Sequence, residues 1–156
     1  MNNFLRRRRP VRVLLVEDND MYAQTIELLL GSSDGVEFVG RACDGAEGCK
    51  LAAELDPDCF LMDISMPVLN GFEATAAIRQ RRPDVRIVML TSSDDPRDRA
   101  QAQSVGASSY LTKESPLHEL EAAVTEASPA RARQQAAWRR GVARRPCGGA
   151  AHVLPT

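Results

Sequence analysis

Residues 58–71 read DCFLMDISMPVLNG. This stretch opens on a short apolar run, meets a carboxylate at Asp63, passes through Pro67 and reaches Gly71. A short apolar run bounded by turn residues is typical of a buried strand in a parallel sheet. The stretch therefore predicts a buried strand that carries Asp63 at its carboxyl end.

Runs of the same kind recur along the chain and are separated by segments of helical length. The predicted strands are residues 11–16 (VRVLLV), 36–40 (VEFVG), 58–62 (DCFLM), 86–90 (RIVML) and 108–111 (SSYL). The predicted helices are residues 21–30, 46–55, 71–80, 98–104 and 116–127. Strands that alternate with helices predict βαβ units. The expected fold is therefore α/β, a doubly wound five-stranded parallel sheet with helices on both faces.

The ends of two predicted helices carry specific expectations. Asp20 is expected to cap the first helix, because a short polar side chain there can accept a hydrogen bond from the first turn. Ser115 is expected to cap the last helix, with Pro116 at its first position. The helix at residues 98–104 has few large apolar residues, so we expect it to be the least firmly packed.

Charge is distributed unevenly along the 156 residues, whose formal net charge is −1. Residues 1–12 and 128–156 hold eleven arginines and no acidic residue, so the stretch between them has a net charge of −12. We expect three parts: a basic extension at residues 1–10, a folded domain at 11–127, and an arginine-rich tail at 128–156 that cannot bury much surface. No apolar run reaches the ~18 residues of a membrane-spanning helix, and a cytoplasmic location is expected.

Polar side chains follow the carboxyl ends of four predicted strands. Glu17 and Asp18 follow the first strand, Asp63 the third, Thr91 the fourth and Lys113 the fifth. These strand ends meet at one edge of a parallel α/β sheet, where such sheets bind ligands. Three carboxylates in one place repel each other unless a hard cation such as Mg²⁺ joins them. A carboxylate can also act as a nucleophile and form an aspartyl phosphate.

Taken singly, each of these residues has a plainer interpretation. Glu17 and Asp18 could cap the first helix, Asp63 could be a turn residue, Thr91 a cap and Lys113 a solvated charge. Their coincidence at one predicted sheet edge favours a phosphoryl acceptor site with a bound cation.

Four blocks of sequence resemble the receiver domains of two-component response regulators. They are VLLVEDN (13–19), LMDISMPVLNGFEA (61–74), VMLTSS (88–93) and GASSYLTKES (106–115). The resemblance covers about residues 11–127 in the family's order and spacing. It implies a flavodoxin-like fold with strand order 2-1-3-4-5. It also implies a phosphorelay domain that is not an enzyme, beyond slow self-dephosphorylation.

The resemblance assigns a role to each matching residue. Asp63 matches the phosphoacceptor, which receives its phosphoryl group from a sensor histidine kinase or a histidine phosphotransfer protein. Mg²⁺, or Mn²⁺ in its place, would be held by Glu17, Asp18, Asp63 and the backbone carbonyl of Ser65. Thr91 and Lys113 match the residues that contact the phosphoryl group. Thr91 and Tyr110 match the pair that switches the surface of the fourth helix, fifth strand and fifth helix, which then acts on a partner or forms a homodimer.

The chain departs from the family's pattern in two ways. The acidic pair is Glu17-Asp18 where Asp-Asp is commoner, and Glu114 follows Lys113 where proline is frequent. The blocks look closest to receivers that precede a LuxR-type helix-turn-helix domain. Only 29 residues follow Ala127, too few for that domain, so DNA binding is not expected from this chain.

Two other functions would each account for part of the sequence. A haloacid-dehalogenase-like phosphatase would also use an aspartyl nucleophile, but it needs D-x-D after the first strand, whereas Asp63 follows the third strand and Ser65 takes the place of the second Asp. Nucleic-acid binding by the arginine-rich ends would be salt-dependent and blind to sequence. The net charge of −12 over residues 13–127 opposes it.

Overall fold

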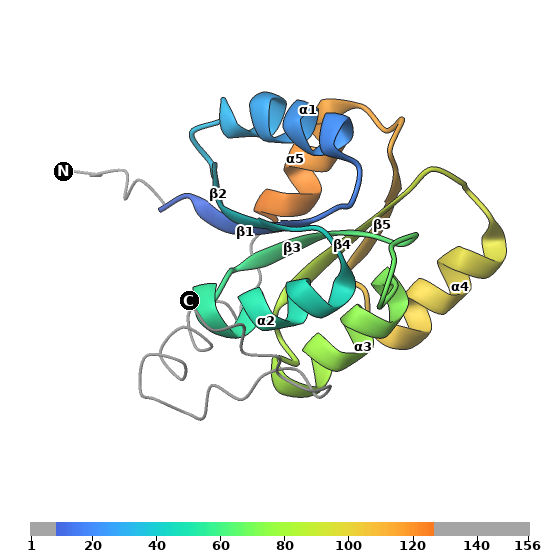
Figure 1. Ribbon diagram of the computed structural model, residues 1–156. Coiled ribbons are helices and arrows are strands. Elements are labelled where there is room, and N and C mark those ends of the chain that lie inside the picture. Colours follow the sequence, from blue (N-terminus) through green and yellow to red (C-terminus); the bar gives the residue numbers. More distant parts are fainter. Residues whose placement is uncertain (1–8, 127–156) are drawn as a thin grey trace, which may run out of the picture.

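The computed structural model describes residues 9–126, in which five strands alternate with five helices (Figure 1). The elements are β1 (Val11–Val16), α1 (Asp20–Gly31), β2 (Val36–Ala42), α2 (Gly45–Leu55), β3 (Cys59–Asp63), α3 (Gly71–Arg81), β4 (Arg86–Thr91), α4 (Pro96–Val105), β5 (Ser109–Thr112) and α5 (Leu117–Thr125). All neighbouring strands are parallel and their order is β2-β1-β3-β4-β5. The predicted flavodoxin-like architecture is confirmed.

The sheet separates two apolar clusters, because alternate residues of a strand point to opposite faces. Along β1, Leu14 and Val16 belong to the cluster under α2 and α3, whereas Val13 and Leu15 belong to the cluster under α1 and α5. Figure 1 shows these helix pairs on the two faces of the sheet. Both faces of the central strands are covered, which explains why their sequences are apolar throughout rather than alternating. Cys59 is buried in the second cluster.

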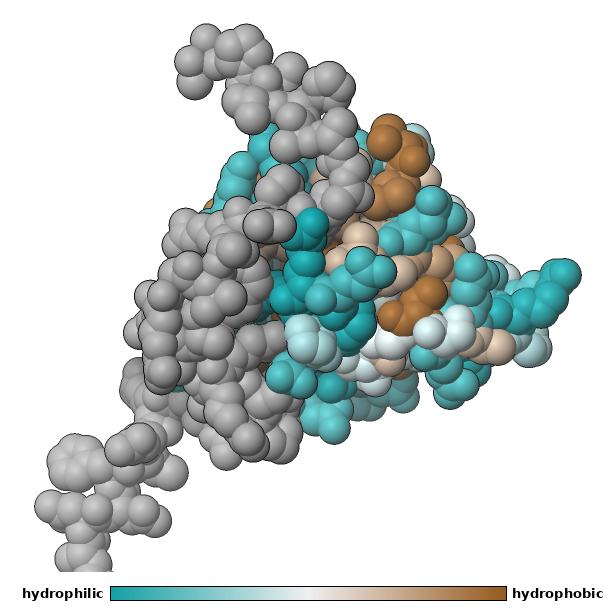
Figure 2. Space-filling view, turned by 90° about the horizontal axis from the view of Figure 1, so that it is seen from below, coloured by the Kyte–Doolittle hydropathy of each residue, from teal (hydrophilic) through white to brown (hydrophobic). Residues whose placement is uncertain are grey.

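Helix α4 is held to the domain by little apolar surface. Ala102 is its single buried residue, in agreement with the weak packing predicted for this segment. Among the described residues visible in Figure 2, hydrophilic residues predominate and hydrophobic ones form small separate areas. None of the helices in residues 9–126 is both long and apolar enough to cross a membrane.

Two predicted helix caps were wrong. Asn19, not Asp20, caps α1, and its side chain accepts a hydrogen bond from the backbone N of Tyr22 at 2.9 Å. At α5 the cap position is occupied by Pro116, which has no side-chain hydrogen bond to offer. Ser115 instead lies 3.3 Å, oxygen to oxygen, from the hydroxyl of Thr112. Strand β1 ends as predicted, whereas the other four strands end one or two residues later, because pairing with a neighbour extends them beyond their apolar runs.

Both ends of the described chain lie at the amino edge of the sheet, where the strands begin. The backbone N of Val11 donates to the carbonyl of Gly35 at 2.8 Å. A Cβ added at the same Gly35 would lie 3.5 Å from Cγ2 of Thr125, so the end of α5 is beside the start of β1. Arg86, at the start of β4, pairs with Glu126 at 2.8 Å. The opposite edge of the sheet is therefore free of both ends.

Candidate functional site

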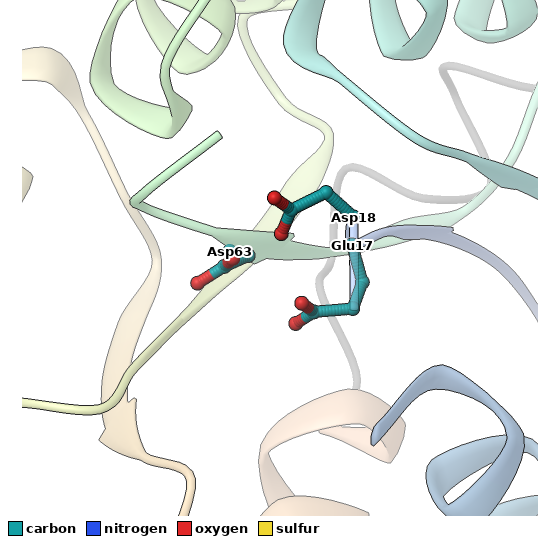
Figure 3. A group of neighbouring side chains, drawn as sticks. All are labelled: Glu17, Asp18 and Asp63. Carbon is teal, nitrogen blue, oxygen red and sulfur yellow. The ribbon is translucent and has the colours of Figure 1, made fainter. Parts of the chain in front are cut away.

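Three carboxylates converge at the carboxyl edge of the sheet (Figure 3). Val16 of β1 pairs with Met62 of β3, so the residues that follow these two are brought side by side. Glu17, Asp18 and Asp63 each offer an oxygen, and the three oxygens lie within 4.8 Å of one another. Three hard oxygen donors at this spacing fit a small divalent cation such as Mg²⁺. The structure thus brings together the acidic residues predicted from the sequence.

Lys113 completes this cluster from the fifth strand. Its backbone N donates to the carbonyl of Thr91 at 2.8 Å, which extends the pairing of β5 with β4 beyond the strand end. Its Nζ lies 2.7 Å from Oε2 of Glu17 and 3.4 Å from Oδ1 of Asp63. One ammonium therefore faces two buried carboxylates.

The environment of Asp63 favours its protonated form. Burial and then the negative charge of Glu17 raise its pKa to about 6, although the ammonium of Lys113 acts in the opposite direction. The side chain is only 6% exposed. A carboxylate held in this way is stabilised when a cation or a covalent modification relieves the repulsion.

Glu17 is the most deeply buried of the three acids. Its Oε1 accepts a hydrogen bond from the backbone N of Asn19 at 3.0 Å, which fixes the turn between β1 and α1. Its Oε2 is paired with Lys113 but accepts no hydrogen bond from any described residue. A buried carboxylate oxygen aimed into the cluster leaves an acceptor for a ligand or a water molecule.

The loop after Asp63 depends on a glycine. A Cβ at Gly71 would overlap the carbonyl oxygen of Asp63, and the backbone N of Gly71 donates to the carbonyl of Ile64 at 2.9 Å. Glycine thus allows the start of α3 to pack against the end of β3. Ser65, whose carbonyl was predicted to bind the cation, is exposed in this loop.

The same loop holds a turn in an unusual conformation. Val68 has a φ of 68°, and the backbone N of Leu69 donates to the carbonyl of Pro67 at 2.8 Å across it. A positive φ with a hydrogen bond spanning a single residue describes a γ-turn, which is strained for a β-branched side chain. The Val68 side chain itself is 82% exposed, so packing does not explain the choice of residue.

Thr91 and Tyr110, the predicted switch pair, contact a common residue. The hydroxyl of Thr91 accepts a hydrogen bond from the backbone N of Ser93 at 3.1 Å. The hydroxyl of Tyr110 donates to the carbonyl of Ser93, also at 3.1 Å. Arg99 of α4 lies over the Tyr110 ring, 4.7 Å from its centroid. The loop before α4 is therefore held by both predicted switch residues.

Two residues near the cluster carried no prediction. Tyr22 of α1 lies under the Lys113 ammonium, whose Nζ is 4.5 Å from the ring centroid. Arg41 donates from Nε and Nη2 to the backbone carbonyl of Glu17 at 3.2 and 3.0 Å. Arg41 lies near the carboxyl end of β2, so the rule that placed the other residues at strand ends could have found it. Tyr22 projects from a helix, and no sequence signal pointed to it.

Known proteins resemble this chain over the same region. A family model described as the response regulator receiver domain matches residues 13–125. The transcriptional regulatory protein LiaR of Bacillus subtilis is 39% identical over 118 residues, which cover 76% of this chain and 56% of that protein. Response regulator GacA of Pseudomonas viridiflava is 37% identical over 114 residues, covering 73% of this chain and 53% of that protein. The chain thus spans about half the length of these relatives.

Solved structures agree with the sequence matches. The signal receiver domain of the putative response regulator NarL from Mycobacterium tuberculosis superposes with a TM-score of 0.71 at 32% identity, covering 75% of this chain and 94% of that one. A two-component response regulator of the LuxR family from Aurantimonas sp. SI85-9A1 superposes with a TM-score of 0.70 at 32% identity, covering 84% and 99%.

Proposed function

Because the chain belongs to the response regulator receiver domain family, a signalling family of two-component systems, we propose that it accepts a phosphoryl group on Asp63 and switches a surface in response. Receiver domains are phosphorylated by histidine kinases. The observation that carries the proposal is the placement of Asp63. This carboxylate is buried beside two other acids, and its Oδ1 lies 3.4 Å from the ammonium of Lys113.

The proposed reaction is an in-line transfer from a phosphohistidine. An oxygen of Asp63 attacks the phosphorus atom, the P–N bond breaks, and its electron pair returns to the histidine nitrogen. Such a transfer needs positioning and positive charge more than covalent help from the protein. Lys113 supplies positive charge to one phosphoryl oxygen, and the hydroxyl of Thr91 can donate to another.

The acidic residues would hold the cation on which the reaction depends. Receiver domains generally bind Mg²⁺ through acidic residues, and Mn²⁺ has the same preference for oxygen ligands. We propose that Asp18 and Asp63 bind it directly, Glu17 through water, and Ser65 through its backbone carbonyl. The bound ion would neutralise charge on the phosphoryl oxygens. Asp18 is exposed, which leaves the cation site open to the donor protein.

The proposed switch involves the loop before α4. Once Asp63 carries a phosphoryl group, the Thr91 hydroxyl turns to it and releases the backbone N of Ser93. Tyr110 then gives up its bond to the carbonyl of Ser93 and turns inward. The surface of α4, β5 and α5 changes shape, and α4 can follow because Ala102 is its one buried residue.

Several further predictions belong to this proposal. The receiver unit is residues 11–127, the phosphorylated form controls a partner or pairs as a homodimer, and the protein acts in the cytoplasm. Any turnover is limited to slow self-dephosphorylation. Most of the basic extension and all of the arginine-rich tail lie outside the described residues. The prediction that this chain does not bind DNA concerns the same residues.

Intact-mass spectrometry after incubation with acetyl phosphate or phosphoramidate tests the acceptor. We expect wild type to gain one phosphoryl group only when Mg²⁺ is present, and Asp63→Asn to gain none. Asp34→Asn is the matched control, because it removes the same charge from an exposed site that precedes β2 at the amino edge of the sheet. Phosphorylation of Asp63→Asn to the wild-type level would place the acceptor elsewhere.

Hydrogen exchange tests the switch separately. Amides of residues 92–105 should exchange faster in phosphorylated wild type than in the unmodified protein. Thr91→Val should still be phosphorylated but should lose this difference, because valine cannot hydrogen-bond to the phosphoryl group. Equal exchange in both states of the wild type would contradict the switch and leave the acceptor site unaffected.

A further inference from the structure

The aromatic ring of Tyr22 belongs to the surroundings of Lys113. Tyr22 lies in the first turn of α1, where its backbone N is fixed by the cap residue Asn19 at 2.9 Å. Its ring centroid is 4.5 Å from Nζ of Lys113. The same Nζ faces Glu17 at 2.7 Å and Asp63 at 3.4 Å. Two carboxylates and one ring face therefore surround a single ammonium group.

Lysine needs such support when it must hold one position. Its ammonium sits on a flexible four-carbon stem, so many side-chain conformations are open to it. The carboxylate of Glu17 is nearer than that of Asp63, so its attraction alone would draw the ammonium of Lys113 away from Asp63. An aromatic face attracts a cation without neutralising it, and the attraction grows when water is excluded.

We propose that Tyr22 is a positioning residue for phosphoryl transfer, whose ring holds the Lys113 ammonium beside Asp63. This inference rests on the proposed function and adds to it a residue outside the strand-end cluster. With the ring beneath it, Lys113 moves from the carboxylate of Glu17 to a phosphoryl oxygen on Asp63 without becoming solvated. Tyr22 is not itself a catalytic residue, because it acts through Lys113.

The chemistry of the Tyr22 hydroxyl is consistent with this role. Burial, followed by the negative charges of Glu17 and Asp63, raises the pKa of Tyr22 to about 12. The hydroxyl therefore stays protonated at neutral pH, and the ring keeps the neutral face that attracts a cation. Since the ring and not the hydroxyl contacts Nζ, phenylalanine should be able to replace tyrosine.

Tyr22 also packs against the apolar cluster under α1 and α5, so the test must separate positioning from stability. Tyr22→Phe keeps the ring, and Tyr22→Leu keeps apolar volume but loses the aromatic face. Both variants leave the charged residues of the site in place. The full chain is used throughout, with thermal denaturation of each variant as the measure of folding.

Three measurements on each variant then decide the matter: the rate of phosphorylation by acetyl phosphate at saturating Mg²⁺, the affinity for beryllofluoride as a phosphoryl mimic, and the affinity for Mg²⁺ alone. We expect Tyr22→Leu to lower the rate and the beryllofluoride affinity about threefold to tenfold, as befits a cation–π contact. Its Mg²⁺ affinity should stay at the wild-type level, because Lys113 contacts the phosphoryl group and not the cation. Tyr22→Phe should match wild type in all three.

A nuclear magnetic resonance experiment supplies a readout that does not depend on phosphorylation. The ε-methylene protons of Lys113 should be shifted upfield by the ring in wild type and Tyr22→Phe, and not in Tyr22→Leu. Wild-type phosphorylation rates in Tyr22→Leu would overturn the inference, as would an equal loss of Mg²⁺ and beryllofluoride affinity, which indicates a structural role. If wild type itself gains no phosphoryl group at Asp63, the proposed function fails. If the upfield shift is still seen in that case, the Tyr22 ring contacts Lys113 but has no role in phosphoryl transfer, and the inference is overturned.

Discussion

The ammonium of Lys113 and the carboxylate of Glu17 form a buried ion pair with Nζ and Oε2 2.7 Å apart. Lys113 is thus closer to Glu17 than to the proposed phosphoacceptor, from which the same Nζ is 3.4 Å away. Glu17 also repels the charge of Asp63, and this repulsion raises the pKa of the Asp63 carboxyl. Glu17, a glutamate where aspartate is commoner, therefore influences the protonation of the proposed phosphoacceptor Asp63.

Replacing Glu17 by glutamine should lower the pKa of Asp63 below about 6, because a repelling charge is removed and Lys113 is released toward Asp63. Carbon-13 titration of the Asp63 carboxyl in Mg²⁺-free buffer measures this directly. The affinity for Mg²⁺ should fall roughly tenfold, the usual cost of losing an outer ligand. Glu37→Gln, an exposed site on β2, is the control and should change neither quantity. An unchanged Asp63 pKa in Glu17→Gln would contradict this account.

Asp63→Asn should stabilise the protein at alkaline pH in the absence of Mg²⁺. The pKa of Asp63 is raised from 3.8 to about 6 in the folded state, so folding is favoured when Asp63 is protonated. That stability is fully present below about pH 4 and is lost as the pH rises through 6. At about 1.4 kcal/mol for each pKa unit, the variant should gain up to about 3 kcal/mol at pH 8 and nothing at pH 4.

Urea unfolding at the two pH values measures this difference. Asp34→Asn serves as the exposed control and should show no pH-dependent gain. Saturating Mg²⁺ should reduce the advantage of Asp63→Asn, since the cation relieves the same repulsion in wild type. If Asp63→Asn were stabilised equally at both pH values, the gain in stability would have a cause other than the charge of Asp63.

Arg41 should affect cation binding through the geometry of the acidic turn. It donates two hydrogen bonds to the carbonyl of Glu17, and its Nη2 lies 2.7 Å from Oδ1 of Asp20. Arg41→Met keeps the apolar stem and loses both contacts, so the Mg²⁺ affinity should fall roughly tenfold by calorimetry. Arg41→Lys keeps the charge but not the planar guanidinium group, and its Mg²⁺ affinity should fall by a similar factor. Wild-type affinity in Arg41→Lys would show that charge alone matters.

Val68→Gly should raise the melting temperature. A β-branched residue at a φ of 68° costs about 1–3 kcal/mol, whereas glycine adopts this conformation freely and loses roughly 0.5–1 kcal/mol through chain entropy. The net gain is about 1 kcal/mol, or roughly 4 °C by circular dichroism. Val68→Ala keeps a Cβ and should gain less. A lower melting temperature in Val68→Gly would mean that the turn is not strained.

The sequence predicted most of the fold because its strands are buried on both faces. Continuous apolar runs such as residues 87–90 are clear strand signals, and the strand-end rule then brought Asp63 and Lys113 together. The helix caps were less predictable, because Asn19 and Asp20 are both good capping residues and only the path of the turn chooses between them. The contact of Tyr22 with Lys113 depends on how α1 lies across the sheet, which no local pattern encodes.

The beginning of β1 and the end of α5 lie together beside Gly35, at the edge of the sheet away from the acidic cluster. Both ends of the described domain therefore lie at the opposite edge of the sheet from the site where phosphoryl transfer is proposed. Such an arrangement makes the domain interchangeable: it can be fused to different neighbours without rebuilding the surface that a donor protein must reach. Under the proposed switch, the constraint on those neighbours would come from the surface of α4, β5 and α5 and not from the linker that attaches them.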